Sequence, residues 1–273
     1  MSKCSILACQ VSVPKTRSCN DRDNHVDRIS DLVSQKLFAQ PSDLVVLPEL
    51  STIEYSRESF SRLDSLAELL DGRSVGVWQK VARMHSCYIV FGMPRIQDNH
   101  YRISQIVIDS HGNINGYYDK LHICQYGASM EKEFFDRGEN LHVFSINDIR
   151  FSPIICYDIR IPELCRTLTL THGVDCILHS GAYFRDESFD SWKAFVTTRS
   201  MENQIYLLSL NRAGVDFGQS MFALPWTDQN TPIAMLDEYC ESFTRFTVDT
   251  GCIANIRENY TFLGDKLDDY GTL

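Results

Sequence analysis

Two short apolar runs constrain the fold of this 273-residue chain more than any other feature. Val45 to Leu47 and Ile154 to Ile155 are apolar without interruption, which is typical of strands that are covered on both faces. Such strands belong to layered α/β folds, in which ligands bind at the carboxyl ends of the strands. Glu49 and Cys156 each lie just beyond one of these runs, and Lys120 follows a third predicted strand. The sequence therefore predicts one site that these three residues share.

The beginning of the chain predicts a strand, a helix and a second strand in succession. The first strand is expected from Ile6 to Val13 and the second from Asp43 to Leu47. The helix between them is expected from Asp21 to Gln40, where Pro41 stops it. Four apolar residues share one face of that helix: Val26, Ile29, Val33 and Leu37.

The rest of the chain alternates predicted helices with strands and hairpins. Further helices are expected over Ser59 to Leu70, Ser74 to Ser86, Glu163 to Thr171 and Phe189 to Asn203. Further strands are expected over Tyr88 to Met93, Ile103 to Asp109, Ile114 to Tyr118, Leu141 to Ile146, Arg150 to Ile155, Val174 to His179, Ile205 to Leu210, Pro232 to Leu236, Phe243 to Val248 and Cys252 to Ile256. This mixture indicates a mixed sheet, or two sheets face to face with helices outside. No repeat or linker divides the series, so residues 1–273 are predicted to form a single domain.

The charge and cysteine content exclude several classes of protein. A formal net charge of −10 and a pI near 5.2, with no cluster of Lys and Arg, argue against nucleic acid or an anionic membrane surface as a partner. The amino-terminal segment is polar, and no apolar run reaches the roughly 18 residues of a membrane span, so a cytoplasmic protein is expected. The ten cysteines are scattered without a C-x-x-C pair, which predicts free thiols and no metal site.

Cys156 differs from the other cysteines because it lies between the apolar run Phe151 to Ile155 and a helical segment. A thiol at a helix start meets free N–H groups and partial positive charge, which favour the thiolate and any oxyanion beside it. Considered alone, each of these three residues has an ordinary structural interpretation. Cys156 would pack in the core, Glu49 would be a loop carboxylate and Lys120 would be a solvated lysine. Together they supply the thiol, the carboxylate and the ammonium that acyl transfer needs.

Three motifs carry a resemblance to a known family: Leu47-Pro48-Glu49-Leu50, Asp119-Lys120-Leu121-His122 and Ile155-Cys156-Tyr157-Asp158-Ile159-Arg160-Ile161-Pro162-Glu163. With them the chain resembles the nitrilase superfamily of carbon–nitrogen hydrolases over almost its whole length. The resemblance implies a four-layer αββα sandwich, a Glu-Lys-Cys triad, no metal or organic cofactor, and a homodimer or higher homo-oligomer. The run Cys-Tyr-Asp-Ile-Arg is similar to the amidase and carbamoylase branches, whereas true nitrilases usually place Trp-Glu after the cysteine. A small linear amide and water are therefore the expected reactants.

In the expected mechanism, Cys156 attacks the carbonyl carbon of the amide and leaves a thioester after ammonia departs. Glu49 takes the thiol proton and later gives it to the departing nitrogen. Lys120 and the backbone N–H of Tyr157 stabilise the oxyanion. A carboxylate base needs a raised pKa, so Glu49 is expected to be buried with little water around it.

A second carboxylate is expected to hold the Lys120 ammonium in place and to offset its desolvation. Glu131 is assigned to this role because it lies seven residues before Gly138, with Glu133 as the alternative.

Four further residues are candidates for contacts with the substrate. Tyr55, Tyr157 and Tyr183 are expected to line the pocket, although aromatic residues at strand ends also serve in packing alone. Arg160 is expected either to bind a substrate carboxylate or to pair with a neighbouring carboxylate, Asp158 or Glu163, and the ion pair is the preferred interpretation.

The first interpretation of the chain is an amidase that makes a carboxylic acid and ammonia. The alternative is an N-carbamoyl amide hydrolase, which releases an amine and carbon dioxide as well as ammonia. A true nitrilase and a catalytically silent scaffold are less favoured alternatives, and the intact triad of Glu49, Lys120 and Cys156 argues against the scaffold.

Overall fold

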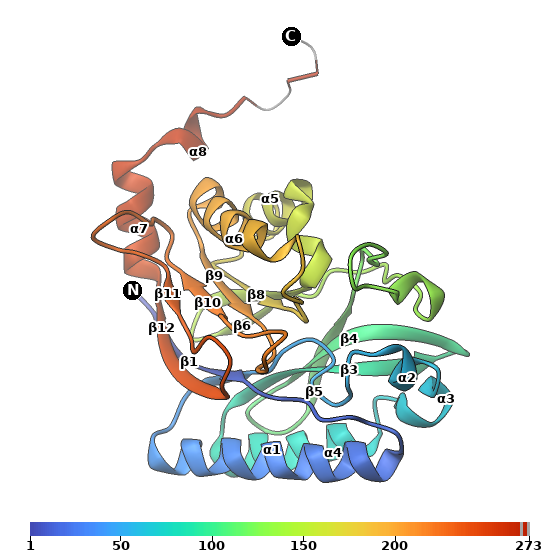
Figure 1. The fold of residues 1–273 in the computed structure, drawn as a ribbon. Coiled ribbons are helices and arrows are strands. Elements are labelled where there is room, and N and C mark those ends of the chain that lie inside the picture. The colour runs from blue at the N-terminus through green and yellow to red at the C-terminus, as the bar shows by residue number, and fades with distance from the viewer. Residues whose placement is uncertain (268–269, 272–273) are drawn as a thin grey trace.

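In the computed structural model, which describes residues 1–267 and 270–271, the chain forms two six-stranded sheets packed face to face (Figure 1). Helices α1 and α4 cover the outer surface of one sheet, and α5 and α6 cover that of the other. The four-layer αββα sandwich implied by the resemblance is therefore confirmed.

Each sheet has three parallel strands at its centre and antiparallel strands at its edges. The first sheet runs in the order β12 (Ser242–Asp249), β1 (Lys3–Gln10), β2 (Leu44–Val46), β3 (Tyr88–Gln97), β4 (His100–Ile108) and β5 (Ile114–Asp119). The second sheet runs in the order β11 (Ala234–Met235), β10 (Met221–Ala223), β9 (Tyr206–Leu210), β8 (Cys176–Ser180), β7 (Ile149–Ile155) and β6 (Phe144–Ile146). The helices are α1 (Cys19–Ala39), α2 (Arg57–Phe60), α3 (Leu63–Leu66), α4 (Arg73–His85), α5 (Pro162–Leu170), α6 (Phe189–Asn203), α7 (Thr250–Asn259) and α8 (Phe262–Asp265).

Alternate residues of the central strands face different cores. In β1, Ile6 packs between the two sheets, whereas Leu7 faces α1 and α4. In β8, Leu178 packs between the sheets, whereas Ile177 faces α5 and α6. Strands with two covered faces are nearly continuous apolar runs, and the runs Val45 to Leu47 and Ile154 to Ile155 correctly predicted two of them, β2 and β7.

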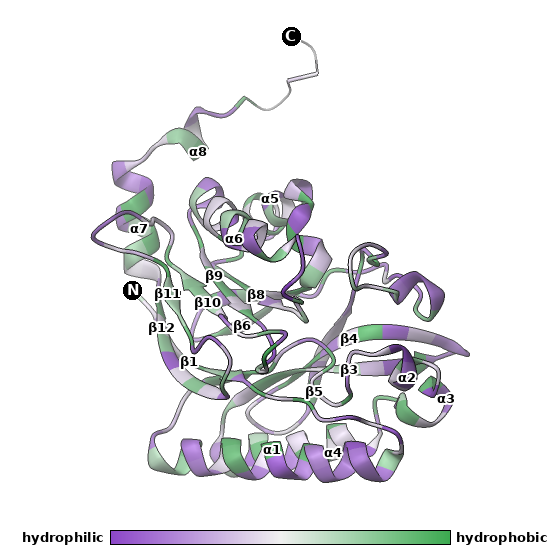
Figure 2. Cartoon of the chain, in the orientation of Figure 1, coloured by the Kyte–Doolittle hydropathy of each residue, from purple (hydrophilic) through white to green (hydrophobic). Residues whose placement is uncertain are grey.

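Helix α1 lies within two residues of its predicted bounds at each end. The Ser18 hydroxyl caps it by accepting a hydrogen bond from the Asp21 backbone N–H, which explains its earlier start. The four apolar residues assigned to its inner face are all buried. Figure 2 shows hydrophilic and hydrophobic segments alternating along α1, as expected of a helix with one face on a sheet.

Two predicted elements are wrong. The segment predicted as a strand from Cys252 to Ile256 belongs to helix α7, because the Asp249 side chain caps a helix by accepting from the Gly251 N–H. The helix predicted from Ser59 to Leu70 is divided into α2 and α3. None of the helices within the described residues combines the length and the apolar character that crossing a bilayer requires.

Candidate active site

The ends of three strands bring the predicted site residues together. β2 and β5 run in the same direction, since β2 is parallel to β3 and β4 is antiparallel to both β3 and β5. Glu49 and Lys120 therefore leave the same edge of the first sheet, and their side chains meet. Cys156 follows β7 in the facing sheet, and Glu131 begins the 3₁₀ turn η1 (Glu131–Glu133). Glu131 and Cys156 line one small cavity, with Lys120 and Glu49 fully buried close to it.

The Lys120 ammonium lies between two carboxylates in the protein interior. Its Nζ is 2.8 Å from Glu49 Oε1 and 2.6 Å from Glu131 Oε1, and all three side chains are fully buried. Burial alone disfavours the ammonium, but the charges of Glu131 and Glu49 outweigh this effect and raise the pKa of Lys120 well above its ordinary value. The two carboxylates therefore stabilise the charged form of Lys120. An ammonium has three N–H donors, and these two contacts leave one for a ligand.

Glu49 combines a raised pKa with an oxygen that accepts no hydrogen bond. Burial raises the pKa of Glu49 to about 6 against the opposing charge of Lys120, and the charge of Glu131 adds to the increase. Oε1 accepts from Lys120, whereas no group within residues 1–267 and 270–271 donates to the buried Oε2. A buried acceptor without a donor is uncommon, and here it leaves a lone pair free to take a proton.

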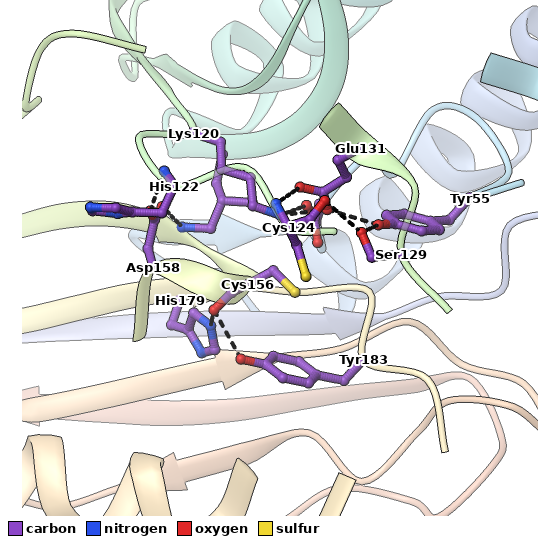
Figure 3. A network of polar contacts seen from close by, with 12 residues as sticks. Tyr55, Lys120, His122, Cys124, Ser129, Glu131, Cys156, Asp158, His179 and Tyr183 are labelled. Atoms are coloured by element: carbon purple, nitrogen blue, oxygen red, sulfur yellow. Dashed lines mark hydrogen bonds and ion pairs between the residues drawn. The ribbon is translucent and has the colours of Figure 1, made fainter. Parts of the chain in front are cut away.

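The structure separates the two candidates for the second carboxylate. Glu131 is buried and accepts from the Tyr55 hydroxyl at 2.7 Å and from the Cys124 backbone N–H at 2.9 Å, in addition to Lys120 (Figure 3). Glu133 lies at the surface, where both its oxygens accept from the guanidinium at the start of α2. Of the two residues, Glu131 is the one that contacts Lys120.

Cys156 begins the 3₁₀ turn η2 (Cys156–Arg160) in a backbone conformation that is rare for a residue with a side chain. Its φ angle is +47°, in the left-handed region. Its carbonyl oxygen accepts hydrogen bonds from His179 Nε2 and from the Tyr183 hydroxyl, both at 2.9 Å (Figure 3). These contacts hold the turn where the chain leaves β7.

Cys156 lies at a strand-to-helix turn as expected, but the short turn η2 that begins there does not favour its thiolate. Helix α5 begins only at Pro162, beyond the turn η2. Burial and the charge of Glu49 raise the pKa of the Cys156 thiol well above its ordinary value, although the charge of Lys120 acts in the opposite direction. The residue is therefore a thiol at rest, and it needs a base to become a nucleophile.

The three tyrosines proposed for the pocket line the same cavity as Cys156 and Glu131. The hydroxyls of Tyr55 and Tyr183 are already bound, the first to Glu131 and the second to the Cys156 carbonyl. The ring of Tyr157 packs edge to face on another tyrosine of the cavity wall. These side chains therefore provide an aromatic wall, in which two of the three hydroxyls have protein partners.

Arg160 enters this cavity without an ion-pair partner among the residues that the structure describes. Its guanidinium lies 4.9 Å from the ring centroid of Phe195 and 5.4 Å from that of Tyr126. The ion pair preferred for it above is wrong, because neither Asp158 nor Glu163 lies within ion-pair distance of it, and Asp158 accepts from other groups. Nη2 of Arg160 is buried and has no hydrogen-bond partner among the described residues. A guanidinium held between rings with a free donor is well placed to bind a carboxylate.

Arg212 was not among the predicted site residues, yet it holds the loop that carries Glu49. Its buried guanidinium donates to the carbonyl oxygens of Glu49 at 3.1 Å, Leu50 at 2.6 Å and Ile53 at 2.8 Å. Leu50 has a φ of +46°, so the loop adopts a conformation that needs such support. The available signal was a charged residue just after the apolar run Ile205 to Leu210, because a buried charge requires partners.

His179 was not among the predicted site residues either, because the expected mechanism needs no histidine. It is fully buried in β8, with Nε2 at the Cys156 carbonyl and Nδ1 2.7 Å from Ser209 Oγ. Burial lowers the pKa of His179 to about 4, so the ring is neutral near pH 7. A histidine inside an apolar strand was the available signal. Over the part of the chain that the structure describes, no three His, Cys, Asp or Glu side chains are grouped to hold a metal ion.

Comparison with known proteins relates this arrangement to one family. Residues 8–229 match the family model described as carbon-nitrogen hydrolase. A 2-oxoglutaramate amidase of Bacillus subtilis is 31% identical over 223 residues, covering 77% of this chain and 83% of the relative. A probable nitrilase of Schizosaccharomyces pombe is 29% identical over 274 residues, covering 96% of each chain. The solved structure of Nit3 from Saccharomyces cerevisiae, a member of branch 10 of the nitrilase superfamily, has a TM-score of 0.84 at 20% identity and covers 100% of this chain and 97% of Nit3.

Proposed function

This chain belongs to the carbon-nitrogen hydrolase family, and from that premise we propose that it hydrolyses the amide of a small linear substrate that also carries a carboxylate. The products are a carboxylic acid and ammonia, and the reaction passes through a thioester on Cys156. One observation carries the proposal: the thiol of Cys156 and the unpaired guanidinium of Arg160 line the same small cavity. The homodimer and the cytoplasmic location expected above stay predictions.

The first half of the reaction forms the thioester. Cys156 Sγ attacks the amide carbon while its proton moves to Glu49, because a thiol with a raised pKa is not available as a preformed thiolate. The free Oε2 of Glu49 is the acceptor. Glu49 then gives this proton to the amide nitrogen, the C–N bond breaks, and ammonia leaves.

Two donors stabilise the negative charge that develops on the carbonyl oxygen. The first is the third N–H of Lys120, which its contacts with Glu49 and Glu131 leave unused. The second is the backbone N–H of Tyr157, directly after the nucleophile. Each donor of this kind contributes roughly 3 kcal/mol to the stability of the transition state.

The second half of the reaction releases the acid. Water attacks the thioester carbon while Glu49 again takes a proton, and the proton then returns to the departing sulfur of Cys156. Ammonia therefore leaves before water reacts, which predicts ping-pong kinetics.

The charge of Arg160 supports a substrate with a carboxylate at the end remote from the amide. The name of the Bacillus subtilis relative, 2-oxoglutaramate amidase, describes a substrate of this kind. Asp186 also borders the cavity, but its Oδ1 accepts from the backbone and hydroxyl of Ser188. Although burial acts in the opposite direction, these hydrogen bonds and the charge of Arg160 lower the pKa of Asp186. Arg160 nevertheless forms no ion pair among the described residues and keeps a donor for an anionic substrate.

An N-carbamoyl amino acid is the second candidate, because it too has an amide at one end and a carboxylate at the other. Arg160 favours both substrates equally. Release of carbon dioxide together with ammonia identifies the carbamoyl reaction, and ammonia alone identifies the amidase.

The proposal is tested by an ammonia-release screen in which substrates differ only at the end remote from the amide. The monoamides of four- and five-carbon dicarboxylic acids are compared with their methyl esters, with N-carbamoyl amino acids and with aliphatic nitriles. We expect the highest kcat/KM for a monoamide with a free carboxylate and no release of carbon dioxide. Turnover of nitriles alone, or of no compound in the screen, would contradict the proposal.

Replacement of Arg160 by glutamine is expected to lower kcat/KM for the carboxylate substrate about 10- to 100-fold, since a charge-assisted hydrogen bond contributes about 1.5–3 kcal/mol. The methyl ester of the same amide lacks the carboxylate and serves as the matched control, with an expected change below threefold. An equal loss for both substrates would show that Arg160 acts on folding or on the nucleophile.

The rate of thioester formation is expected to fall as the pH drops through about 6. The pKa of Glu49 is raised to about 6, so below that pH the carboxyl group is protonated and cannot accept the thiol proton. The measurement is kcat/KM between pH 4.5 and 8 at constant ionic strength. A profile that stays level down to pH 5 would assign the base to another group.

A further inference from the structure

A chain of hydrogen bonds that the proposed chemistry does not use holds the carbonyl group of Cys156. A carbonyl oxygen only accepts, so His179 Nε2 carries the hydrogen that bridges the 2.9 Å between them. In the neutral ring Nδ1 is then an acceptor, and Ser209 Oγ, 2.7 Å away, donates to it. Trp192 Nε1 donates in turn to Ser209 Oγ at 2.8 Å. Each of these three hydrogen bonds therefore has a defined donor and acceptor.

The second donor to the same carbonyl is tied to the same tryptophan. Tyr183 donates its hydroxyl to the Cys156 oxygen at 2.9 Å, and its ring stacks on Trp192 with centroids 4.7 Å apart and planes 10° from parallel. All the side chains of this arrangement are buried. Figure 3 shows His179 and Tyr183 meeting at the carbonyl from one side, while Lys120 lies on the other side of Cys156. We call His179, Tyr183, Ser209 and Trp192 the carbonyl clamp.

The clamp acts on more than the carbonyl, because a peptide group is planar. The carbonyl of Cys156 and the N–H of Tyr157 belong to one trans peptide group and point in opposite directions. Fixing the carbonyl toward the clamp therefore fixes the N–H away from it. The same contacts support the φ of +47° at Cys156, a conformation that a residue with a side chain does not keep without support.

We propose that His179 and Tyr183 are positioning residues that aim the Tyr157 N–H and the Cys156 thiol at the reacting amide. This inference rests on the proposed function, in which that N–H stabilises the oxyanion. A misplaced donor stabilises the transition state less, but hardly changes the binding of the substrate. Loss of the clamp is therefore expected to lower kcat and to leave KM nearly unchanged. A merely structural role would instead lower the yield of folded protein and leave kcat per folded molecule unchanged.

NMR spectroscopy can detect the hydrogen bond from His179 to the Cys156 carbonyl without turnover. The signal can be assigned because Cys precedes Tyr at two places in the sequence, Cys87-Tyr88 and Cys156-Tyr157. Protein labelled with ¹³C at cysteine carbonyls and ¹⁵N in tyrosine gives one carbonyl–amide correlation peak for each pair. In His179→Leu, which has no donor at this position, the Cys156 carbonyl resonance is expected to shift while the Cys87 resonance stays in place. In His179→Gln, which keeps an N–H donor, most of the shift is expected to be restored.

Steady-state kinetics measure the consequence for catalysis. His179→Leu is expected to lower kcat about 10- to 100-fold with KM within threefold, since small misplacements of reacting groups have effects of this size. His179→Gln is expected to recover kcat to within about fivefold of the wild type, in line with the donor it retains. Tyr183→Phe is expected to lower kcat less, because His179 still holds the oxygen. Its matched control is Tyr206→Phe, which removes another buried hydroxyl far from Cys156 and is expected to leave kcat unchanged.

The two proposals fail in distinguishable ways. If the wild type cleaves no amide in the screen, the proposed function is wrong. The carbonyl–amide spectrum of His179→Leu then tests whether the clamp exists. An unmoved Cys156 resonance in folded His179→Leu overturns the clamp. A kcat within twofold of the wild type in folded His179→Leu overturns its positioning role, even if the resonance shifts.

Discussion

Replacement of Cys156 by alanine is expected to lower the rate of ammonia release about 10⁵-fold or more, since removal of a covalent nucleophile has effects of this size. Without the sulfur no thioester forms, and the remaining donors do not activate water for direct attack on an unactivated amide. Initial rates with the best amide of the screen measure the effect. The fold is expected to survive, because the substitution removes one atom from a side chain that borders a cavity.

Cys165→Ala is the matched control for this variant. Cys165 is a buried thiol of helix α5 that packs in the core between the second sheet and its helices. Its loss is expected to change the rate less than threefold, because the side chain has no place in the chemistry. Activity of Cys156→Ala above about one per cent of the wild type would exclude Cys156 as the obligatory nucleophile.

Replacement of Glu49 by glutamine is expected to lower kcat about 10³- to 10⁴-fold, the upper part of the range for a general base. The amide oxygen of glutamine still accepts from Lys120, but the group cannot take the proton of a thiol whose pKa is raised well above its ordinary value. Alkylation of Cys156 by iodoacetamide is expected to slow in parallel. Rates with amide and with iodoacetamide therefore measure the same loss in two ways.

Glu133→Gln provides the control for the loss of a carboxylate. Glu133 is exposed and pairs with Arg57, away from the cavity, and its replacement is expected to leave kcat within twofold of the wild type. If Glu49→Gln also kept kcat within tenfold, the proton acceptor would have to be another group.

The layers and the central strands of this protein could be predicted because a strand that is buried on both faces has a recognisable apolar sequence. A strand between two cores is apolar at nearly every position, and Val45 to Leu47 and Ile154 to Ile155 are runs of this kind. Helix α7 differs, because the apolar residues after its cap Asp249 also fit the pattern of a strand.

The position of Glu49, Lys120 and Cys156 just beyond strand ends could also be predicted. Glu49 and Lys120 leave one edge of the first sheet, whereas Cys156 follows β7 of the facing sheet, and the way the two sheets face each other has no signature in the local sequence. The electrostatics of Cys156 could not be predicted, since they depend on burial and on Glu49 rather than on a helix start. Likewise, the free guanidinium of Arg160 depends on the two rings that hold it in the cavity. Neither feature has a signature in the local sequence.

Intact mass spectrometry of the enzyme during turnover of an activated ester tests the central claim most directly. The p-nitrophenyl ester of the preferred acyl group has a good leaving group, so acylation outruns hydrolysis and the acyl-enzyme accumulates. We predict a mass increase equal to the acyl group, located on the peptide that contains Cys156 and absent from Cys156→Ala. Rapid ester hydrolysis without an adduct, or an adduct on the neighbouring Cys124, would contradict the thioester mechanism.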